Sequence, residues 1–391
     1  MNTHAHALLV ATLLAVMVAP FPCSGAPAVS VAPDPLDQWE VGVLPGMSTE
    51  VVQAVVFATG RFLATTAGAT YVSTNGLTWV KVATTGGADL CFGNRRFVRV
   101  GGLLRVDSST DGTTWRMGEP GPWYSYTGVA YGNGRFAAAG SRGEGIDFIT
   151  SEDGLVWQHS FTSVFTGAGF GMAFGHGTFV YPYGGGVLWS TNGLDWHPSE
   201  ARGGYGVAFG SGRFVGCALA NAFQLSADGQ RLLSEGRIQG LPDAQFFRIA
   251  YGNGVFVSVG SEGHVVTSRD GVSWVVRNSG VSDELWGVAF GAGRFLIGSS
   301  KGKILRSGIV PPAWSVPRVR PDQSLLLEDR TMLLTVEAPY GREVSVEASD
   351  DLAQWNLIAT DPCTLGEFEV YDKQASSRSQ RFYRVKQAPA P

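Results

Sequence analysis

Short apolar runs, separated by Gly-rich and Asx-Gly turns, fill most of the chain between residues 37 and 308. One hairpin signature, seen at residues 290–295 as Phe-Gly-Ala-Gly-Arg-Phe, returns seven times, with its second Phe at positions 62, 97, 136, 179, 214, 256 and 295. These positions are on average about 39 residues apart. A repeat of this length, built from short strands, is typical of a β-propeller, in which each repeat forms one small sheet or blade. The pattern therefore predicts an all-β fold with a seven-bladed β-propeller.

The first six repeats can each be read as four apolar runs. In the sixth repeat they span residues 247–251, 255–259, 264–268 and 273–277. Aromatic and β-branched residues favour strands, while Gly and Asx-Gly provide the positive φ angles that tight hairpins need. Four strands per repeat is the content of one blade.

A second motif, Ser-x-Asx-Gly-x-x-Trp, joins the third and fourth run of most repeats and is here called the box. It occupies residues 73–79, 109–115, 151–157, 190–196 and 268–274, and in residues 226–232 a Leu replaces the Trp. We expect the Asx side chain to fold over its own backbone, the Ser hydroxyl to hold a neighbouring main-chain group, and the Trp to pack across the hairpin. Because the motif recurs in every such repeat, it predicts a structural turn rather than a catalytic or calcium site.

The seventh repeat has only three runs, at residues 288–290, 294–297 and 303–307. The apolar segment 39–41 lies 40 residues before Trp79, at the position of a fourth strand that lacks its other three. We therefore predict that this N-terminal strand completes the last blade and closes the ring. Closure would hide sheet edges that otherwise invite aggregation and would tie the two ends of the propeller together.

The composition changes after the repeats. Residues 310–322 are rich in Pro and predict a stiff linker, with the propeller ending at residue 309. Apolar runs at 324–338, 343–348, 356–360, 367–371 and 381–385 predict a small β-sandwich over residues 323–387. Residues 349–355 resemble the box, but the Gly-x-Gly-x-Phe hairpin is missing, so no eighth blade is predicted.

Residues 8–19 form an apolar stretch that is too short to span a bilayer and is followed by Pro and small residues. Residues 1–28 are therefore predicted to be a signal peptide, although no Lys or Arg precedes the apolar stretch and a membrane-retained N-terminus is the alternative. The expected location is secreted, periplasmic or on the cell surface, with no membrane insertion once the signal is removed.

Charge and cysteine content narrow the choice of partners. The chain has 29 basic and 33 acidic residues and no long run of either sign, so nucleic acid is not an expected partner. Beyond the signal, Cys91, Cys217 and Cys363 form neither a disulfide framework nor a metal-binding pattern, and Cys91 and Cys217 are expected to be small buried side chains. No cofactor or metal is predicted, and a monomer is expected.

The boxes resemble the Asp-box, or neuraminidase-type (BNR), repeats, and the whole repeat looks like those of propellers related to the photosystem II assembly factors. The resemblance covers about residues 37–308. It implies the fold but leaves activity open, because sialidases, xyloglucan-cleaving enzymes and non-catalytic binding proteins share such repeats. The box here also lacks one residue that the enzyme form has between the Asx and the Gly. The C-terminal segment is similar to small β modules of large secreted bacterial proteins, which implies export.

Aromatic residues open the innermost strand of four successive repeats, at Phe170, Tyr205, Phe247 and Trp286. They predict either packing between blades or an aromatic surface at one mouth of the central channel, suited to sugars or peptide segments. The candidate ligand-binding residues on the face formed by the connections between repeats are Trp123, Tyr124, Tyr183, Tyr205 and Trp286, with Arg142 and Arg202 as polar companions.

Two functions follow from these observations. The first is a secreted, non-catalytic recognition or scaffold protein that binds a glycan or a protein partner through a propeller face. The alternative is a sialidase-like or other glycoside hydrolase, for which scattered surface Arg, Asp and Glu residues are available but no motif selects a catalytic set. An enzyme predicts a deep pocket with converging carboxylates and arginines, whereas a binding protein predicts an aromatic face without them.

Overall fold

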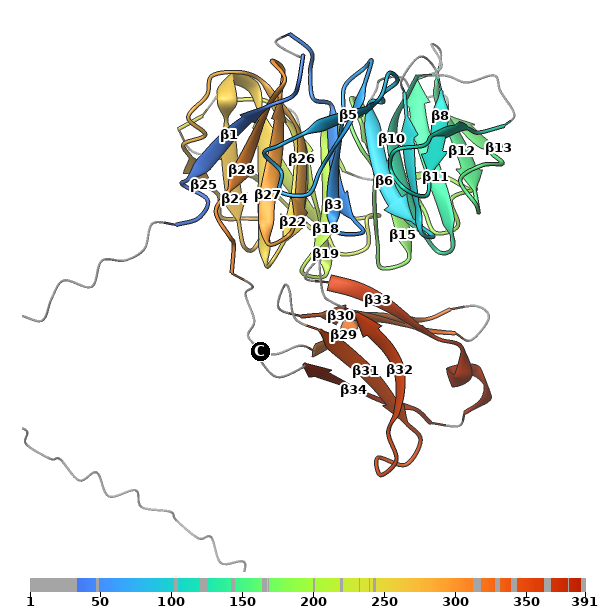
Figure 1. Cartoon of the computed structure of the whole chain (residues 1–391). Coiled ribbons are helices and arrows are strands. Elements are labelled where there is room, and N and C mark those ends of the chain that lie inside the picture. Colours follow the sequence, from blue (N-terminus) through green and yellow to red (C-terminus); the bar gives the residue numbers. More distant parts are fainter. Residues whose placement is uncertain are drawn as a thin grey trace, which may run out of the picture. The chain divides into compact units, whose positions relative to one another are not determined.

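The computed structural model describes residues 34–391 except 47–48, 102–104, 120–124, 142–144, 164–166, 168, 200, 219–220, 232, 239, 242–243, 312–317, 328–330, 339–342, 362–366, 379 and 388–391. The predicted signal peptide and Cys363 lie outside the described residues. The described residues form seven antiparallel sheets of four strands each and two of three strands each (Figure 1). No helix among them is long and apolar enough to cross a membrane.

The four-stranded sheets are numbered 1 to 7 in chain order. Sheet 1 contains β2 (Ala54–Ala58), β3 (Arg61–Thr65), β4 (Thr70–Ser73) and β5 (Val80–Ala83). Sheet 2 contains β6 (Asp89–Gly93), β7 (Arg96–Val100), β8 (Val106–Ser109) and β9 (Arg116–Met117). Sheet 3 contains β10 (Ser125–Gly132), β11 (Arg135–Ser141), β12 (Ile146–Ser151) and β13 (Gln158–Ser163). Sheet 4 contains β14 (Ala173–Gly175), β15 (Thr178–Tyr183), β16 (Gly186–Ser190) and β17 (His197–Pro198).

The remaining four-stranded sheets follow the same order. Sheet 5 contains β18 (Gly204–Gly210), β19 (Arg213–Ala218), β20 (Ala222–Ser226) and β21 (Ser234–Arg237). Sheet 6 contains β22 (Phe246–Gly252), β23 (Val255–Gly260), β24 (Val265–Ser268) and β25 (Val275–Arg277), with the short 3-10 helix η2 (Ser261–Gly263) between β23 and β24. Sheet 7 contains β26 (Leu285–Gly291), β27 (Arg294–Ser299), β28 (Lys303–Ser307) and β1 (Trp39–Val43).

Sheet 7 confirms the predicted closing strand. β1 pairs antiparallel with β28, so that Trp39 lies opposite Ser307 and Val43 opposite Lys303. Leu36 and Leu44 flank β1 and are 3% and 1% exposed, respectively. The two ends of the repeat region are therefore joined by a strand ladder and by buried side chains on either side of it.

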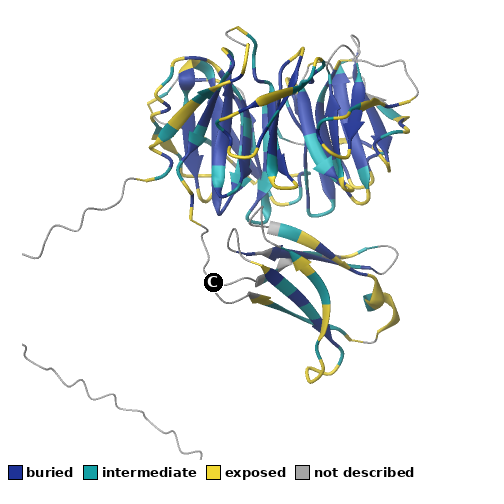
Figure 2. Ribbon diagram, in the orientation of Figure 1, coloured by how far each residue is buried: buried dark blue, intermediate teal, exposed yellow. Residues whose placement is uncertain are grey.

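The first strands of the seven sheets lie side by side. Each contacts the first strand of the next sheet in chain order, and β26 of sheet 7 contacts β2 of sheet 1, which closes the cycle. The fourth strands β5, β9 and β25 are largely exposed, as Figure 2 shows by colour. The first strand of each sheet is thus the inner one and the fourth lies at the outside.

Neighbouring sheets interlock through glycines and aromatic rings. A Cβ atom on Gly252 at the end of β22 would lie 1.9 Å from Cγ of Phe290 in β26, and one on Gly132 would lie 2.2 Å from the Phe174 ring. The same close approach occurs at Gly93, Gly175, Gly210 and Gly291. The first glycine of the hairpin is therefore needed because the aromatic ring of the next sheet leaves no room for a Cβ atom. Its own φ is not positive, whereas the second glycine of the hairpin has a positive φ. The seven Phe residues of the hairpin signature are all at most 2% exposed, as predicted for Phe214.

The box forms the turn that the sequence predicts. In residues 268–274, the amide of Gly271 donates to Oγ of Ser268 at 2.8 Å, while the amides of Val272 and Ser273 donate to Oδ1 of Asp270 at 2.8 and 2.7 Å. The other five boxes repeat these bonds. The packing of the box Trp differs from the prediction. Trp274 stacks on Phe223 of the preceding sheet at a centroid distance of 3.9 Å, whereas the prediction placed the Trp across its own hairpin.

The C-terminal residues form two three-stranded antiparallel sheets. One contains β29 (Arg318–Leu326), β30 (Met332–Glu337) and β33 (Glu367–Asp372), and the other contains β31 (Val344–Ser349), β32 (Asn356–Asp361) and β34 (Phe382–Gln387), with the 3-10 helix η3 (Lys373–Ser377) after β33. Apolar side chains of both sheets share one core.

Two details of this region differ from the prediction. The run 324–338 is divided between β29 and β30, and β29 begins at Arg318, within the range predicted as linker. Pro321 lies where the register between β29 and β30 is interrupted, so the strand tolerates a residue that has no amide hydrogen to donate.

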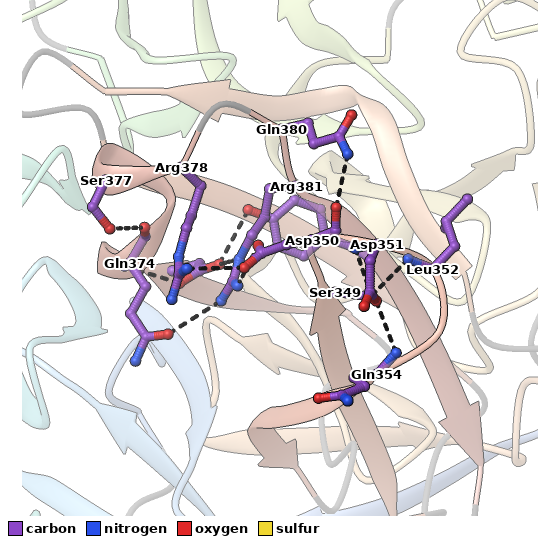
Figure 3. Close-up of polar contacts among 12 residues, drawn as sticks. Ser349, Asp350, Asp351, Leu352, Gln354, Gln374, Ser377, Arg378, Gln380 and Arg381 are labelled. Atoms are coloured by element: carbon purple, nitrogen blue, oxygen red, sulfur yellow. Dashed lines mark hydrogen bonds and ion pairs between the residues drawn. The ribbon is translucent and has the colours of Figure 1, made fainter.

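The box-like segment 349–355 adopts the box turn outside the repeat region (Figure 3). The amides of Ala353 and Gln354 both donate to Oδ1 of Asp351 at 2.8 Å, and the Leu352 amide donates to Oγ of Ser349 at 2.9 Å. Leu352 takes the place of the box glycine with a φ of 64°. The box is thus a local turn that does not require a four-stranded sheet around it.

Candidate binding site at the mouth of the central cavity

The inner strands surround a cavity of about 280 Å³, here called the central cavity. Its described lining comes from the first strand of all seven sheets and, in sheet 4, also from residues 170–172 just before β14. Most of these side chains are small or apolar. A cavity that every repeat helps to form is a natural place for a ligand, since it is the one surface shared by all of them.

An ion pair crosses the central cavity. Arg248 in β22 places Nη1 2.5 Å from Oδ1 of Asp89 in β6, and its Nη2 donates to the carbonyl of Ala88 at 2.7 Å. The second oxygen of Asp89 accepts the amide hydrogen of Val129 at 2.9 Å. The side chains of Arg248 and Asp89 are 12% and 8% exposed, so both charges are largely removed from water. The pair joins sheets 2 and 6, which are not neighbours in the ring.

Four aromatic residues at the starts of the inner strands of sheets 4 to 7 form a continuous group, here called the aromatic group. Phe170 stacks on Tyr205 at 5.4 Å and meets Trp286 edge-on at 5.2 Å between ring centroids. Phe247 stacks on Trp286 at 4.4 Å and meets Tyr205 edge-on at 6.0 Å. Main-chain bonding supports the arrangement, because the Phe170 amide donates to the Tyr205 carbonyl at 2.7 Å.

The aromatic group borders a second cavity of about 280 Å³, here called the mouth cavity. Phe170, Trp286 and Arg248 line it. The rest of its described lining, here called the polar wall, is small or polar and consists of Gln53, Ala67, Ala88, Gly101, Ser125 and Thr127. Arg248 and Phe170 line both cavities, so the mouth cavity and the central cavity adjoin at these two residues. The site combines an apolar wall, a polar wall and a guanidinium group already paired with a carboxylate.

The direction of the strands shows at which end of the inner strands the mouth cavity lies. Residues at or near the start of six of the seven inner strands line the mouth cavity, and successive strands of a sheet run in alternate directions. The connections from one sheet to the next therefore lie at this end, and the box turns and Gly-x-Gly hairpins lie at the other. The mouth cavity is on the face that the sequence analysis favoured for binding.

The predicted site residues have four different placements. Tyr205 and Trp286 belong to the aromatic group, where Phe170 and Phe247 each contact both. Tyr183 is 5% exposed and belongs to the core shared by sheets 3 and 4, where burial raises the pKa of its hydroxyl. The side chain of Arg202 is 73% exposed, pairs with Glu235 at 3.5 Å, and does not line the mouth cavity. Trp123, Tyr124 and Arg142 lie outside the described residues.

Sequence reasoning missed Asp89 and Arg248, although the repeats contain a signal for them. The second position of the inner-strand pattern, directly after the aromatic position, is Ala54, Asp89, Gly128, Gly171, Gly206, Arg248 and Gly287 in the seven repeats. The other repeats have Gly or Ala at this aligned position, so an Asp and an Arg there indicate side chains that make a specific contact not found in the other repeats. The column does not reveal that the two meet, because they lie 159 residues apart.

The described residues offer little for catalysis. They contain no group of three or more His, Cys, Asp or Glu residues that could hold a metal ion. His159 and His197, considered together in the sequence, have different partners, since His159 pairs with Asp147 at 3.0 Å and His197 packs on Trp189. Burial and the Asp89 carboxylate raise the pKa of the Cys91 thiol well above its ordinary value, so it does not supply a thiolate at neutral pH.

Comparison with known proteins identifies the fold. No protein-family model and no curated protein matches the sequence. A catalytically inactive virginiamycin B lyase from Staphylococcus aureus with quinupristin is similar in structure, with a TM-score of 0.60 and 14% identity over 69% of this chain and 99% of that one. The chain folds as a β-propeller.

Two further propellers are similar. YCF48 from Cyanidioschyzon merolae has a TM-score of 0.54 and 17% identity over 69% of this chain and 98% of that one. YCF48 bound to D1 peptide has a TM-score of 0.55 and 17% identity over 73% of this chain and 99% of that one. At these identities the likeness establishes the architecture, and function has to be argued from the site.

Proposed function

We propose that this propeller is a non-catalytic recognition module that binds a segment of a partner protein at the mouth cavity. The observation that carries the proposal is the aromatic group. Its rings Phe170 and Trp286 line the mouth cavity beside a polar wall, and Tyr205 and Phe247 pack against these two rings. Rigid aromatic surface next to hydrogen-bonding groups is what peptide-binding sites commonly use, because it buries apolar area at little cost in side-chain entropy.

The packing of the rings favours a peptide over a sugar. Phe247 and Trp286 stack with an interplanar angle of 15°, so each ring covers one face of the other, and Phe170 and Tyr205 stack at 25°. A sugar usually lies flat on an open aromatic face, whereas an apolar side chain can pack against ring edges and the seams between rings. The polar wall, which includes Gln53, Ser125 and Thr127, can pair with main-chain groups of the same segment.

The described residues at the mouth cavity do not provide the pair of carboxyl groups that glycoside hydrolysis requires. Most glycosidases use two carboxyl groups about 5–10 Å apart on either side of the scissile bond. Among the described residues that line the mouth cavity, Arg248 is the charged one, and its partner Asp89 is committed to the ion pair. The YCF48 structure with D1 peptide is consistent with recognition, since it pairs a protein of this fold with a peptide.

The finer architecture belongs to the same proposal. The seven four-stranded sheets would be the seven blades of a propeller over residues 37–309, closed by β1, and the two C-terminal sheets would form a sandwich over residues 323–387. Residues 1–28 would be a signal peptide, placing the protein outside the cytoplasm. The apolar stretch 8–19 and the likeness of the C-terminal segment to modules of secreted proteins support this location.

The test is a peptide and glycan array probed with the full chain lacking residues 1–28, followed by affinity measurements. Changing Tyr205 and Trp286 to Ala should weaken binding of the selected peptide roughly ten-fold or more, as expected for aromatic anchors. Trp189→Ala is the matched control, because Trp189 is also a part-buried Trp but packs on His197 in an outer strand pair.

Three outcomes would contradict the proposal. Selection of glycans alone would support the sugar-binding alternative, and release of free sugar from a selected glycan would support an enzyme. Equal loss of binding in the Trp189→Ala control would place the site away from the mouth cavity.

A further inference from the structure

Two of the rings that line the mouth cavity form a corner. Phe170 and Trp286 meet at an interplanar angle of 84°, with 5.2 Å between their ring centroids. Phe247 stacks on Trp286 at 4.4 Å and so helps to fix the position of the indole. The mouth cavity has a volume of about 280 Å³, which is enough for a long side chain. Because an aromatic ring attracts a cation that lies over its face, a corner of two rings suits a basic side chain.

A carboxylate lies at the edge of this corner. Oε2 of Glu284 accepts a hydrogen bond from Nε1 of Trp286 at 3.4 Å. Glu284 is exposed and forms no ion pair with any described residue. Its negative charge is therefore available to a cation that packs against the Trp286 ring.

The charged groups around Glu284 leave an excess of negative charge. The side chain of its neighbour Asp283 is 3% exposed and pairs with Lys301 at 2.8 Å and with Lys303 at 2.6 Å. Glu50 adds a third carboxylate and, like Glu284, has no ion-pair partner among the described residues. Three carboxylates thus stand against two ammonium groups, and both ammonium groups contact Asp283.

Glu50 lies close to the lining of the mouth cavity. A Cβ atom on Gly68 would lie 3.9 Å from Oε1 of Glu50, and Ala67, next to Gly68, belongs to the polar wall. Oε2 of Glu50 is buried and accepts no hydrogen bond from the described residues. Negative charge is therefore found beside the cavity in the segment before β2 of sheet 1 as well as in the segment before β26 of sheet 7.

The guanidinium group at the mouth cavity does not reverse this sign. Arg248 is the charged residue among the described lining, and its Nη1 lies 2.5 Å from Oδ1 of Asp89. An anionic ligand would have to compete with the Asp89 carboxylate for Arg248. A cationic ligand would meet Glu284 without such a competitor.

We propose that the segment bound at the mouth cavity carries a basic side chain, Lys or Arg, which packs in the corner of Phe170 and Trp286 and pairs with Glu284. This specificity rests on the proposed function, since it describes the segment that the mouth cavity binds. The aromatic corner holds the apolar stem of the basic side chain, and the Glu284 carboxylate accepts hydrogen bonds from its charged end.

The test uses two synthetic peptides, acetyl-Leu-Arg-Leu-amide and the same peptide with citrulline in place of arginine. Citrulline has nearly the same shape as arginine but no charge. Both peptides are titrated into the full chain lacking residues 1–28 and followed by ligand-observed NMR. The arginine peptide should bind roughly three- to five-fold tighter, the size expected of one partly exposed ion pair. The preference should vanish at about 1 M salt, where the Debye length is about 3 Å.

Glu284→Gln should abolish the preference and retain binding of the citrulline peptide, because a side-chain amide oxygen can still accept the hydrogen bond from Trp286 Nε1. Glu152→Gln is the matched control. The Glu152 side chain is 81% exposed but belongs to the box of sheet 3, at the other end of the strands, so this variant should keep the preference.

Equal affinities for the two peptides, or a preference that survives in Glu284→Gln, would overturn the basic specificity. If the peptides selected by the array still lose binding when Tyr205 and Trp286 are changed to Ala, the proposed function stands without it. Selection of no peptide by the array, together with no binding of either synthetic peptide, would overturn both.

Discussion

At the residue scale, the box turn depends on one oxygen acceptor and not on charge. Asn75 and Asn192 accept the same two amide hydrogens as the aspartates of the other boxes, at 2.9–3.0 Å. The aspartates nevertheless add a dependence on pH. Partial burial acts to raise the pKa of Asp270, but hydrogen bonds from the Ser273 and Val272 amides outweigh it and hold the pKa at about 2.

Asp270→Asn should make the propeller less sensitive to acid. The pKa of Asp270 is lower in the folded state than the value of about 3.9 in unfolded chains, so its ionised form stabilises the fold above about pH 4. This contribution is lost as the pH falls from about 4 to 2. The variant should therefore melt close to the parent protein at pH 7 and lose less stability between pH 4 and 2, as measured by thermal unfolding across this range.

The reciprocal variant Asn75→Asp is the matched control for that experiment, and it should gain acid sensitivity. If both variants follow the pH profile of the parent, the box carboxylates do not control stability in acid.

At the element scale, strands are held by their neighbours as much as by their own sequence. β1 has exposed Val41 and Val43 and little internal reason to be ordered, yet it is fixed by its ladder to β28. Arg306 adds a contact to Glu40 at 2.8 Å, and Arg277 contacts Asp34 and Asp37, each at 3.0 Å. An apolar anchor, Leu36, and these ionic contacts position an N-terminal strand that has no hairpin partner in sequence.

Removing the chain through Val41 should expose the edge of β28 and lower the melting temperature by roughly 10 °C or cause aggregation. The loss includes Leu36, most of β1 and the contacts of Arg306 and Arg277. Differential scanning calorimetry and light scattering measure the two effects. Removal through Pro33 is the control and should melt like the mature chain; equal melting of the two truncations would show that β1 is dispensable.

Gly252→Ala should destabilise the propeller by about 1–3 kcal/mol, because its new methyl group would overlap the Phe290 ring of the next sheet. Urea unfolding measures this change in the free energy of unfolding. In a Phe290→Leu background the same substitution should cost less, since the ring is gone. Additive effects of the two substitutions would show that the cost comes from the backbone and not from the contact between sheets.

At the scale of the whole molecule, the Arg248–Asp89 pair ties together sheets that do not touch along the ring. Its charges are mostly buried, and each is met by at least one further main-chain contact. Desolvation opposes such a pair, so its presence does not by itself imply stability, but loss of one partner leaves the other charge buried and unpaired.

Asp89→Asn should therefore cost about 3–5 kcal/mol of unfolding free energy. The double variant Asp89→Leu with Arg248→Met should be far closer to the parent, since no uncompensated charge remains. A double-mutant cycle measured by chemical denaturation gives the coupling between the two residues. A small, equal loss in every variant would show that the pair contributes little across the cavity.

The sequence by itself determined the local chemistry of this protein. Hairpin glycines, box residues and apolar alternation act over a few neighbouring residues, so the strands of each repeat, the box turns and the closing strand could be predicted from them. The tertiary structure alone decided what depends on contacts between repeats. In the folded chain, Tyr205 and Trp286 belong to one aromatic group, whereas Tyr183 is buried in the core between two sheets. The box Trp packs against the preceding sheet, and Asp89 forms an ion pair with Arg248. Such contacts join residues far apart in the chain, and their geometry follows from how the sheets pack, which no local pattern encodes.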